Sequence, residues 1–219
     1  MHSSIKNYED IVKSIKSKLE GQKPHKFPKI IAVTKTFTLE NILPLIEYGH
    51  IDYGENKVQE AIEKWTDIKN KNPEIQLHLI GRLQTNKVKF AIKIFDYIHS
   101  VDSAKLAKKI YDEQISQNKK IKIFIQVNIG SEEQKSGVAI DETKELLNLC
   151  RKLKLNVIGL MCIPPANQES NKYFEKMNIL KNNLNLQEVS MGMSSDYLEA
   201  ITNDATYLRI GSGIFGKRY

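Results

Sequence analysis

The stretch Lys29-Ile30-Ile31-Ala32-Val33-Thr34-Lys35-Thr36-Phe37 decides the fold of this chain. Its apolar run, residues 30–34, is typical of a strand that is buried on both faces, as in a parallel sheet. The residues that follow contain no glycine-rich turn, which a doubly wound nucleotide-binding fold places after its first strand. The stretch therefore favours a barrel, with an open doubly wound sheet as the alternative.

Further apolar runs follow the first one, and helical patterns with apolar residues every three to four positions separate them. Such alternation predicts a parallel sheet with helical crossovers, and eight repeats in about 200 residues suit a (β/α)8 barrel. We expect residues 1–219 to form a single α/β domain, a (β/α)8 TIM barrel with an extra N-terminal helix at residues 4–20. The expected strands are 29–34, 51–53, 76–80, 97–100, 122–127, 157–161, 188–190 and 206–210, and the expected helices between them are 40–48, 58–68, 86–94, 104–117, 142–153 and 170–184.

The composition indicates a globular protein. The chain has 219 residues, of which 41% are hydrophobic, and no apolar run long enough to span a bilayer. The N-terminal stretch Met1-His2-Ser3-Ser4-Ile5-Lys6 lacks the apolar core of a signal peptide, so we expect a cytoplasmic location with no membrane partner. Cys150 and Cys162 are the only cysteines, and their spacing suggests neither a disulfide framework nor a metal site.

The net charge of +7 raises the possibility of nucleic-acid binding. Only Arg82, Arg151, Arg209 and Arg218 of the 33 basic residues are arginines, and the lysines are spread along the whole chain. Sequence-specific readers of nucleic acids depend on arginine forks and stacked aromatic side chains, and neither clusters here. We therefore expect no nucleic-acid partner.

Polar residues and glycines follow several strands, where a barrel gathers its functional site. Lys35 closes the first strand, and burial would lower the pKa of its ammonium toward neutrality, as Schiff-base chemistry requires. Taken alone, a strand-end lysine that reaches solvent is the commoner explanation. The segments 192–196 and 211–213 offer the hydroxyls and backbone N–H groups that hold a phosphate, although each is also typical of an ordinary helix cap or turn.

A series of motifs runs in register from residue 30 to residue 216 and resembles the YggS/PROSC family of pyridoxal-phosphate homeostasis proteins, which is related in fold to the N-terminal barrel of alanine racemase. The sequence departs from the family pattern at Arg82, Leu77 and Gly213, and Arg82 adds a cation near the barrel mouth. The motifs are Val33-Thr34-Lys35, Tyr53-Gly54-Glu55-Asn56-Lys57-Val58-Gln59-Glu60, His78-Leu79-Ile80-Gly81-Arg82-Leu83-Gln84-Thr85-Asn86-Lys87, Gln126-Val127-Asn128, Lys135-Ser136-Gly137, Gly159-Leu160-Met161, Ser190-Met191-Gly192-Met193-Ser194-Ser195-Asp196 and Arg209-Ile210-Gly211-Ser212-Gly213-Ile214-Phe215-Gly216.

The resemblance implies pyridoxal 5'-phosphate as the cofactor, held through a Schiff base on Lys35. Arg209 would contact the pyridine nitrogen, and Asn56 would lie beside the ring or Lys35. Met161 and Met193 would pack on the ring face, although a methionine at a strand end more often belongs to the ordinary core. His78 is expected to fill the barrel interior. Lys87 and Lys135 are expected to be surface lysines, with a second anion contact as the alternative. The expected cofactor-binding set, without any catalytic or metal-binding residue, is Lys35, Asn56, Met161, Ser194, Arg209, Gly211 and Ser212.

Three functions compete at this point. The first is a non-catalytic protein of intracellular pyridoxal-phosphate homeostasis, which buffers the cofactor or carries it to apoenzymes that depend on it. The second is an amino-acid racemase-like enzyme, which needs a second base opposite Lys35. The third is a cofactor-free aldolase that uses Lys35 on a phosphorylated sugar. The racemase-like alternative would need a second domain to supply its second base, and we expect none after Tyr219. This expectation favours the homeostasis function and a monomer.

Overall fold

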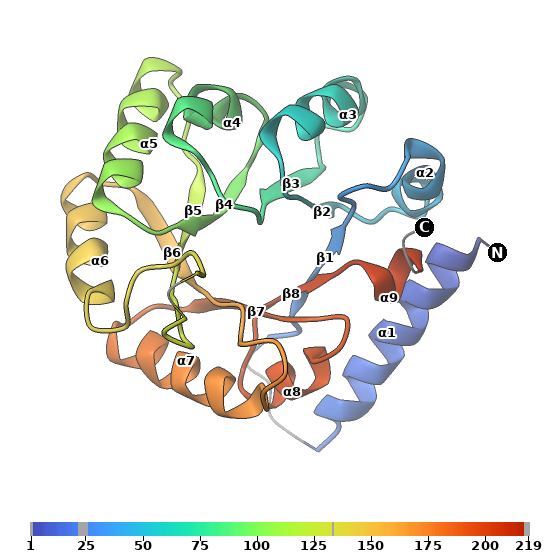
Figure 1. Cartoon of the computed structure of the whole chain (residues 1–219). Coiled ribbons are helices and arrows are strands. Elements are labelled where there is room, and N and C mark those ends of the chain that lie inside the picture. The colour runs from blue at the N-terminus through green and yellow to red at the C-terminus, as the bar shows by residue number, and fades with distance from the viewer. Residues whose placement is uncertain (1, 22–25, 133, 217–219) are drawn as a thin grey trace.

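The computed structural model describes residues 2–21, 26–132 and 134–216, and within them eight parallel strands close into a barrel (Figure 1). Each strand pairs with the next along the chain, and β8 pairs with β1. This arrangement confirms the predicted (β/α)8 barrel over the open doubly wound sheet. The strands are β1 (Lys29–Val33), β2 (Asp52–Glu55), β3 (Gln76–Leu79), β4 (Tyr97–Val101), β5 (Lys122–Gln126), β6 (Asn156–Met161), β7 (Glu188–Met193) and β8 (Tyr207–Ile210).

The helices surround the barrel as an outer ring (Figure 1). In the described part of the chain, no helix combines the length and the apolar character that a membrane span requires. The helices are α1 (Ser3–Leu19), α2 (Leu39–Glu47), α3 (Val58–Lys71), the 3-10 turn η1 (Thr85–Lys87), α4 (Val88–Ile94), α5 (Ala104–Ser116), α6 (Thr143–Lys152), α7 (Asn171–Asn183), α8 (Tyr197–Thr202) and α9 (Ser212–Phe215).

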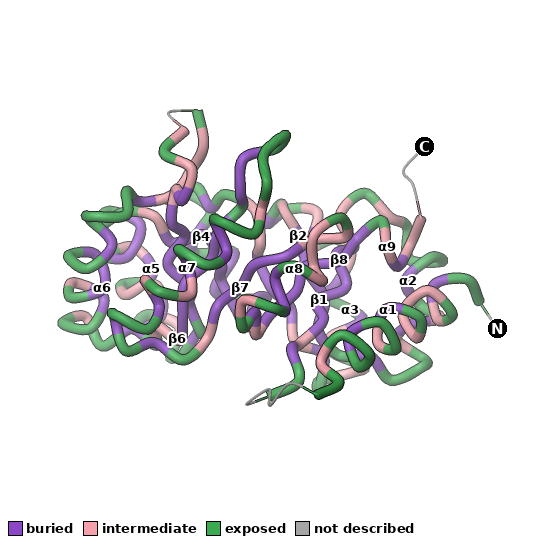
Figure 2. The backbone as a smooth tube through the Cα atoms, turned by 90° about the horizontal axis from the view of Figure 1, so that it is seen from below, coloured by how far each residue is buried: buried purple, intermediate pink, exposed green. Residues whose placement is uncertain are grey.

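Alternation along the strands divides the apolar residues between two layers. Ile30 and Ala32 face the helices and join the large cluster between strands and helices. Ile31 and Val33 face the barrel axis and pack with a smaller interior cluster. Figure 2 shows the buried residues running through the strands, while the exposed residues lie on the outer turns of the helices. The interior cluster comprises Ile31, Val33, Tyr97, Phe124, Met161 and Tyr207.

Helix α1 is the extra N-terminal element that the sequence predicts. It lies beside α2, α8 and α9 (Figure 1), where Ile11 and Ile15 are buried. The side-chain amide of Asn7 donates a hydrogen bond to the carbonyl of Ile214 at 2.9 Å. The helix therefore braces the segment that follows β8.

Two strands differ from the sequence prediction by more than one residue at an end, and the other six agree to within one residue. Strand β2 extends to Glu55, because the carboxylate of Glu55 is buried through partners from α3 that the local sequence does not reveal. Strand β7 extends to Met193, although Gly192 and Met193 were expected to open the next helix. Gly192 has φ +88°, and a Cβ there would lie 2.6 Å from the Cβ of Ala200. The glycine thus permits close packing of β7 on α8 rather than starting that helix.

Candidate functional site

A cavity of about 550 Å³ opens at the carboxyl ends of the barrel strands. This volume falls within the usual range of small-molecule sites, roughly 300–1,000 Å³. Its lining residues come from loops after most of the strands: Val33, Lys35, Asn56, Ile80, Gly81, Arg82, Gln126, Asn128, Gln134, Lys135, Ser136, Ile163, Met193, Ser194, Ser195, Arg209, Gly211 and Ser212.

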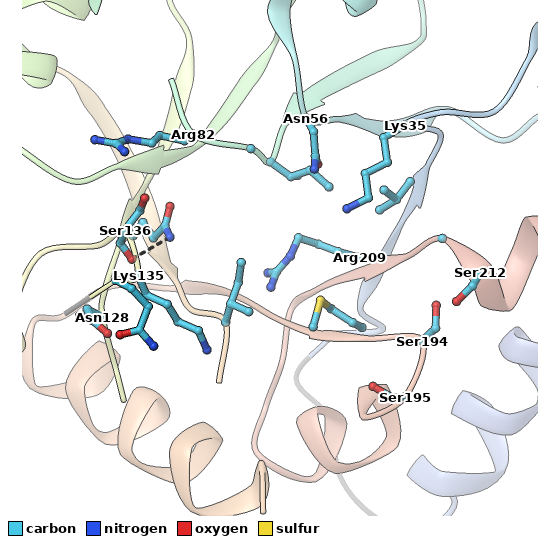
Figure 3. A pocket seen from close by; sticks show the side chains of 18 residues that line it. Lys35, Asn56, Arg82, Asn128, Lys135, Ser136, Ser194, Ser195, Arg209 and Ser212 are labelled. Atoms are coloured by element: carbon cyan, nitrogen blue, oxygen red, sulfur yellow. Dashed lines mark hydrogen bonds between the residues drawn. The ribbon is translucent and has the colours of Figure 1, made fainter. Parts of the chain in front are cut away.

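The cavity brings together every residue of the expected cofactor-binding set except Met161. Figure 3 shows Lys35, Asn56 and Arg209 pointing into the same space, with Ser194 and Ser212 close to each other at one end. Met161 is fully buried in the interior cluster and does not line the cavity, whereas Met193 does.

The lining carries positive charge. Lys35, Arg82, Lys135 and Arg209 contribute cations, and no carboxylate of the described residues lines the cavity. Low-dielectric walls with one sign of charge concentrate counter-ions. The cavity is therefore suited to an anionic ligand.

The loops after β7 and β8 form the end of the cavity that best suits a phosphate. The hydroxyl of Ser194 accepts a hydrogen bond from the backbone N–H of Gly213 at 3.1 Å, which joins the two loops and leaves the hydroxyl hydrogen for a ligand. Ser212 is the first residue of α9, so its backbone N–H has no acceptor within the helix. A Cβ at Gly211 would lie 3.3 Å from the carbonyl oxygen of Val33, so a larger residue would crowd this wall.

The backbone around Lys35 is held from both sides. The ammonium of Lys64 donates to the carbonyl of Thr34 at 2.9 Å, and the N–H of Thr36 donates to a carboxylate oxygen of Glu60 at 2.8 Å. Thr36 has φ +67°, a left-handed conformation that is unfavourable for a β-branched residue. Lys35 itself is half-buried. A strained turn thus directs its side chain into the cavity.

Glu55 and Lys64 form the buried part of this support. The Oε1 atom of Glu55, a fully buried residue, accepts from Lys64 at 2.9 Å and from the indole N–H of Trp65 at 2.9 Å. Burial raises the pKa of Glu60, but the hydrogen bond from Thr36 and the charge of Lys64 outweigh it, so the pKa is lowered overall. We call Glu55, Glu60 and Lys64 the Lys35 clamp. The spacing of four residues between Glu60 and Lys64 on α3 was the signal available in the sequence.

Arg209 is held inside the barrel. Only 4% of the residue is exposed, and its Nη1 donates to the hydroxyl of Ser190 at 2.7 Å while Nη2 donates to the carbonyl of Cys162 at 2.8 Å. Burial lowers the pKa of the guanidinium, and the Cys162 thiol and the Asp196 carboxylate oppose that effect. The sequence did not identify Ser190 or Cys162 as partners.

The other predicted lysines lie in different places. Lys135 is half-buried on the cavity wall, where its ammonium pairs with Glu132 at 2.6 Å and donates to the carbonyl of Pro164 at 3.1 Å. Lys87 is exposed and does not line the cavity. His78 is fully buried, which confirms its predicted place in the barrel interior.

A closed parallel barrel with a lysine after β1 and a buried arginine in β8 defines an alanine racemase-type barrel, and the family model described as the N-terminal domain of alanine racemase matches residues 9–219. The pyridoxal phosphate homeostasis protein of Vibrio alginolyticus is 37% identical to the chain over 232 residues, covering 100% of this chain and 99% of the relative. The chain belongs to the family of pyridoxal phosphate homeostasis proteins, the YggS/PROSC family.

Two further relatives match most of the chain. The pyridoxal phosphate homeostasis protein of Aquifex aeolicus is 39% identical over 200 residues, which cover 87% of each chain. The structure of PipY from Synechococcus elongatus, solved with pyridoxal phosphate bound, matches with a TM-score of 0.82 and 32% identity, over 94% of this chain and 100% of that chain.

Proposed function

We propose that this chain binds pyridoxal 5'-phosphate in the barrel-mouth cavity and takes part in intracellular pyridoxal-phosphate homeostasis, as a buffer or carrier without robust catalytic turnover. One observation carries the proposal: a cationic cavity in which Lys35 and Arg209 lie beside the paired loops after β7 and β8. Those loops offer hydroxyl and backbone donors to a phosphate, while the lysine offers an amine to an aldehyde. Relatives that carry the homeostasis name match this chain over its full length.

Each residue has a role in this proposal. Lys35 would form the Schiff base with the cofactor aldehyde, and Asn56 would lie beside it. Arg209 would donate a hydrogen bond to the pyridine nitrogen, because a guanidinium has donors and no acceptor. Ser194, Gly211 and Ser212 would hold the phosphate. Met161, which the cavity does not expose, supports the site only by packing in the same interior cluster as Val33.

When bound, the cofactor supplies a reactive aldehyde and an electron-withdrawing ring. A guanidinium that donates to the ring nitrogen leaves that nitrogen unprotonated, which makes the ring a weaker electron sink. The placement of Arg209 therefore supports reversible binding over transamination.

The lining of the cavity also supports the non-catalytic role over the racemase-like alternative. A racemase needs a base on each face of the substrate. Among the described lining residues there is no tyrosine, histidine, cysteine or carboxylate, and Lys135 is ion-paired with Glu132. Amino-acid racemisation, measured on the purified protein with added cofactor, separates the two functions: steady turnover would favour the enzyme.

The first experiment is a visible absorbance titration of the purified protein with pyridoxal 5'-phosphate, followed by borohydride reduction and peptide mapping. We expect a new band and a reduced adduct on Lys35. Lys35→Ala should lose the adduct while phosphate-anchored binding persists, and Lys87→Ala, which changes an exposed lysine outside the cavity, should behave like the parent. A folded protein without the band would contradict cofactor binding and favour the cofactor-free aldolase.

The broader setting belongs to the same proposal. We infer a single-domain monomer of the cytoplasm. Both cysteines are buried and form no disulfide, and the reducing conditions of the cytoplasm would keep them as thiols. Recipients would be apoenzymes that depend on pyridoxal phosphate. Mixing the loaded protein with such an apoenzyme, and following the recovery of its activity against free cofactor at the same concentration, tests the carrier role.

A further inference from the structure

A chain of hydrogen bonds crosses the barrel interior and ends on Arg209. The carboxylate Oδ1 of Asp52 lies 3.0 Å from Nε2 of His78, whose Nδ1 lies 3.0 Å from Nε2 of His99. Nδ1 of His99 lies 3.0 Å from the hydroxyl of Ser190, which is 2.7 Å from Nη1 of Arg209. We call these five residues the interior chain. It connects β2, β3 and β4 to β7 and β8 across the barrel axis.

The two ends of the interior chain fix the direction of every hydrogen bond in it. A carboxylate only accepts, so the Nε2 of His78 carries a proton toward Asp52. A neutral His78 then accepts at Nδ1 from the Nε2–H of His99, and a neutral His99 accepts at Nδ1 from the Ser190 hydroxyl. The Ser190 oxygen is left to accept from Arg209, which only donates. One arrangement of protons therefore accounts for all four hydrogen bonds of the interior chain.

Both imidazoles are kept neutral and in place by their surroundings. His78 stacks on Tyr97 with ring centroids 4.1 Å apart, and His99 stacks on Phe124 at 4.2 Å. Both histidines are fully buried, and burial lowers the pKa of His78 and lowers that of His99 well below its usual value. Because each neutral imidazole stacks on an aromatic side chain, it can donate at one ring nitrogen and accept at the other without changing its protonation state.

Arg209 has an unusual set of partners for a buried cation. Within the described residues its side chain donates to a hydroxyl and a carbonyl, both neutral, and the Asp196 carboxylate acts on it electrostatically without forming an ion pair. The negative charge nearest along the interior chain is Asp52, which also lies 3.4 Å from the ammonium of Lys29. Hydrogen bonds in a series polarise one another, so the charge of Asp52 strengthens Ser190 as an acceptor without neutralising the guanidinium.

We propose that His99 and Ser190 are positioning residues for Arg209, and that the interior chain holds its guanidinium in the orientation that meets the cofactor ring while leaving its positive charge unpaired. This inference rests on the proposed binding of pyridoxal phosphate. Neither residue lines the cavity, so both act only through Arg209. Loss of the Ser190 hydroxyl would remove the acceptor of Nη1 of Arg209 and the donor to Nδ1 of His99, and would leave Arg209 with only the carbonyl of Cys162 among the hydrogen-bond partners described here.

The first test uses the apoprotein and needs no variant. Nitrogen-15 NMR of the imidazole rings should show His78 and His99 both neutral, each with its proton on Nε2. A proton on Nδ1 of His99 would overturn the proposal, because the Ser190 hydroxyl would then no longer be directed by the chain. This measurement does not depend on cofactor binding.

The second test titrates variants with pyridoxal 5'-phosphate. Ser190→Ala should bind about tenfold more weakly, as expected for losing one hydrogen bond to a charged group, and its bound-cofactor absorbance band should shift. Ser190→Thr keeps the hydroxyl and should recover most of the affinity and the parent band. Ser100→Ala makes the same change in a buried serine whose hydroxyl has no hydrogen-bond partner among the described residues, and should match the parent.

The outcomes separate this proposal from the proposed function. If the parent protein fails to bind pyridoxal phosphate, the proposed function fails. If the parent binds it and Ser190→Ala matches the parent in affinity and band position, the positioning role fails while the proposed function stands. If Ser190→Ala does not fold, the ring NMR of the parent decides.

Discussion

Lys35 and Arg209 face the same cavity, but the fold holds them by opposite means. The turn of Lys35 is fixed by charged groups of the Lys35 clamp, which lies between β2 and α3. The guanidinium of Arg209 is fixed by neutral groups of the interior chain. A turn whose backbone is held by an ion-paired cluster depends on a few local residues, whereas a guanidinium held through a chain of hydrogen bonds depends on five strands. A substitution in the Lys35 clamp should therefore affect only its own neighbourhood, whereas a substitution in the interior chain should affect contacts between several strands of the barrel.

The largest effect should come from breaking the Lys35 clamp at its buried ion pair. Lys64→Met removes the cation beside the fully buried carboxylate of Glu55, and leaving such a charge unpaired costs about 3–5 kcal/mol of unfolding free energy. Urea denaturation measures this loss. The double variant Glu55→Gln, Lys64→Met should recover much of it.

The control for this prediction is an ion pair that is more exposed than the pair of Lys64 and Glu55. Lys109→Met removes the partner of Glu113 on α5, where 42% of the lysine side chain is exposed, so the change in stability should be far smaller. Equal losses at Lys64 and Lys109 would show that burial of Glu55 does not matter.

The second prediction concerns the stability of the protein at acidic pH, which depends on the histidines of the interior chain. Burial lowers the pKa values of His78 and His99, so the unfolded chain binds protons that the folded protein excludes once the pH falls below about 6.5. Stability should be constant above that pH and decrease below it, by up to about 1.4 kcal/mol per pH unit for each histidine. Urea midpoints between pH 7.5 and 5 measure the slope.

The variant His99→Gln tests the source of that slope. It removes one titrating group and keeps an amide in the barrel interior, so the decrease with pH should become shallower, with His50 and His78 still contributing. An unchanged slope would show that His99 is not excluded from protonation. Stability that does not change with pH would contradict the neutral state of both His78 and His99.

The sequence predicts the barrel and the residues at its mouth better than it predicts the contacts that support those residues. The apolar run before Lys35 and the eightfold alternation predict the barrel because burial imposes its own period on strands and helices. They also predict that Lys35, Ser194 and Arg209 reach one cavity, since parallel strands end at the same face. These inferences need only the position of a residue along its own strand.

Supports that depend on distant partners were not predictable in this way. His99 and Ser190 are 91 residues apart, and each resembles an ordinary strand residue until the barrel closes. Met161 was expected at the ring face, but it lies one layer below Ile163, which takes the place on the cavity wall. A strand register must be known to within two residues to assign such a layer, and the pairing of β5 with β6 shifts register along its length.

The smallest effect on stability should come from the turn that follows Lys35. Thr36 is left-handed at φ +67°, which costs a β-branched residue about 1–2 kcal/mol, whereas glycine adopts this conformation freely at an entropic cost of roughly 0.5–1 kcal/mol. Thr36→Gly keeps the N–H that donates to Glu60, so it should leave stability unchanged or raise it by up to about 1 kcal/mol, as measured in urea.

Thr38→Gly is the matched control, because Thr38 has an ordinary φ of −75° and accepts a hydrogen bond from Asn41. Glycine relieves no strain there, so this variant should be the less stable of the two. If Thr36→Gly were as destabilised as Thr38→Gly, the turn would store no strain, and the Lys35 clamp would orient a relaxed backbone. If Thr36→Gly were more stable than the parent but bound pyridoxal phosphate more weakly, the strained threonine would hold Lys35 toward the ligand at a cost in stability. The interior chain does not impose a cost of that kind on Arg209, because none of its five residues has the left-handed backbone conformation of Thr36.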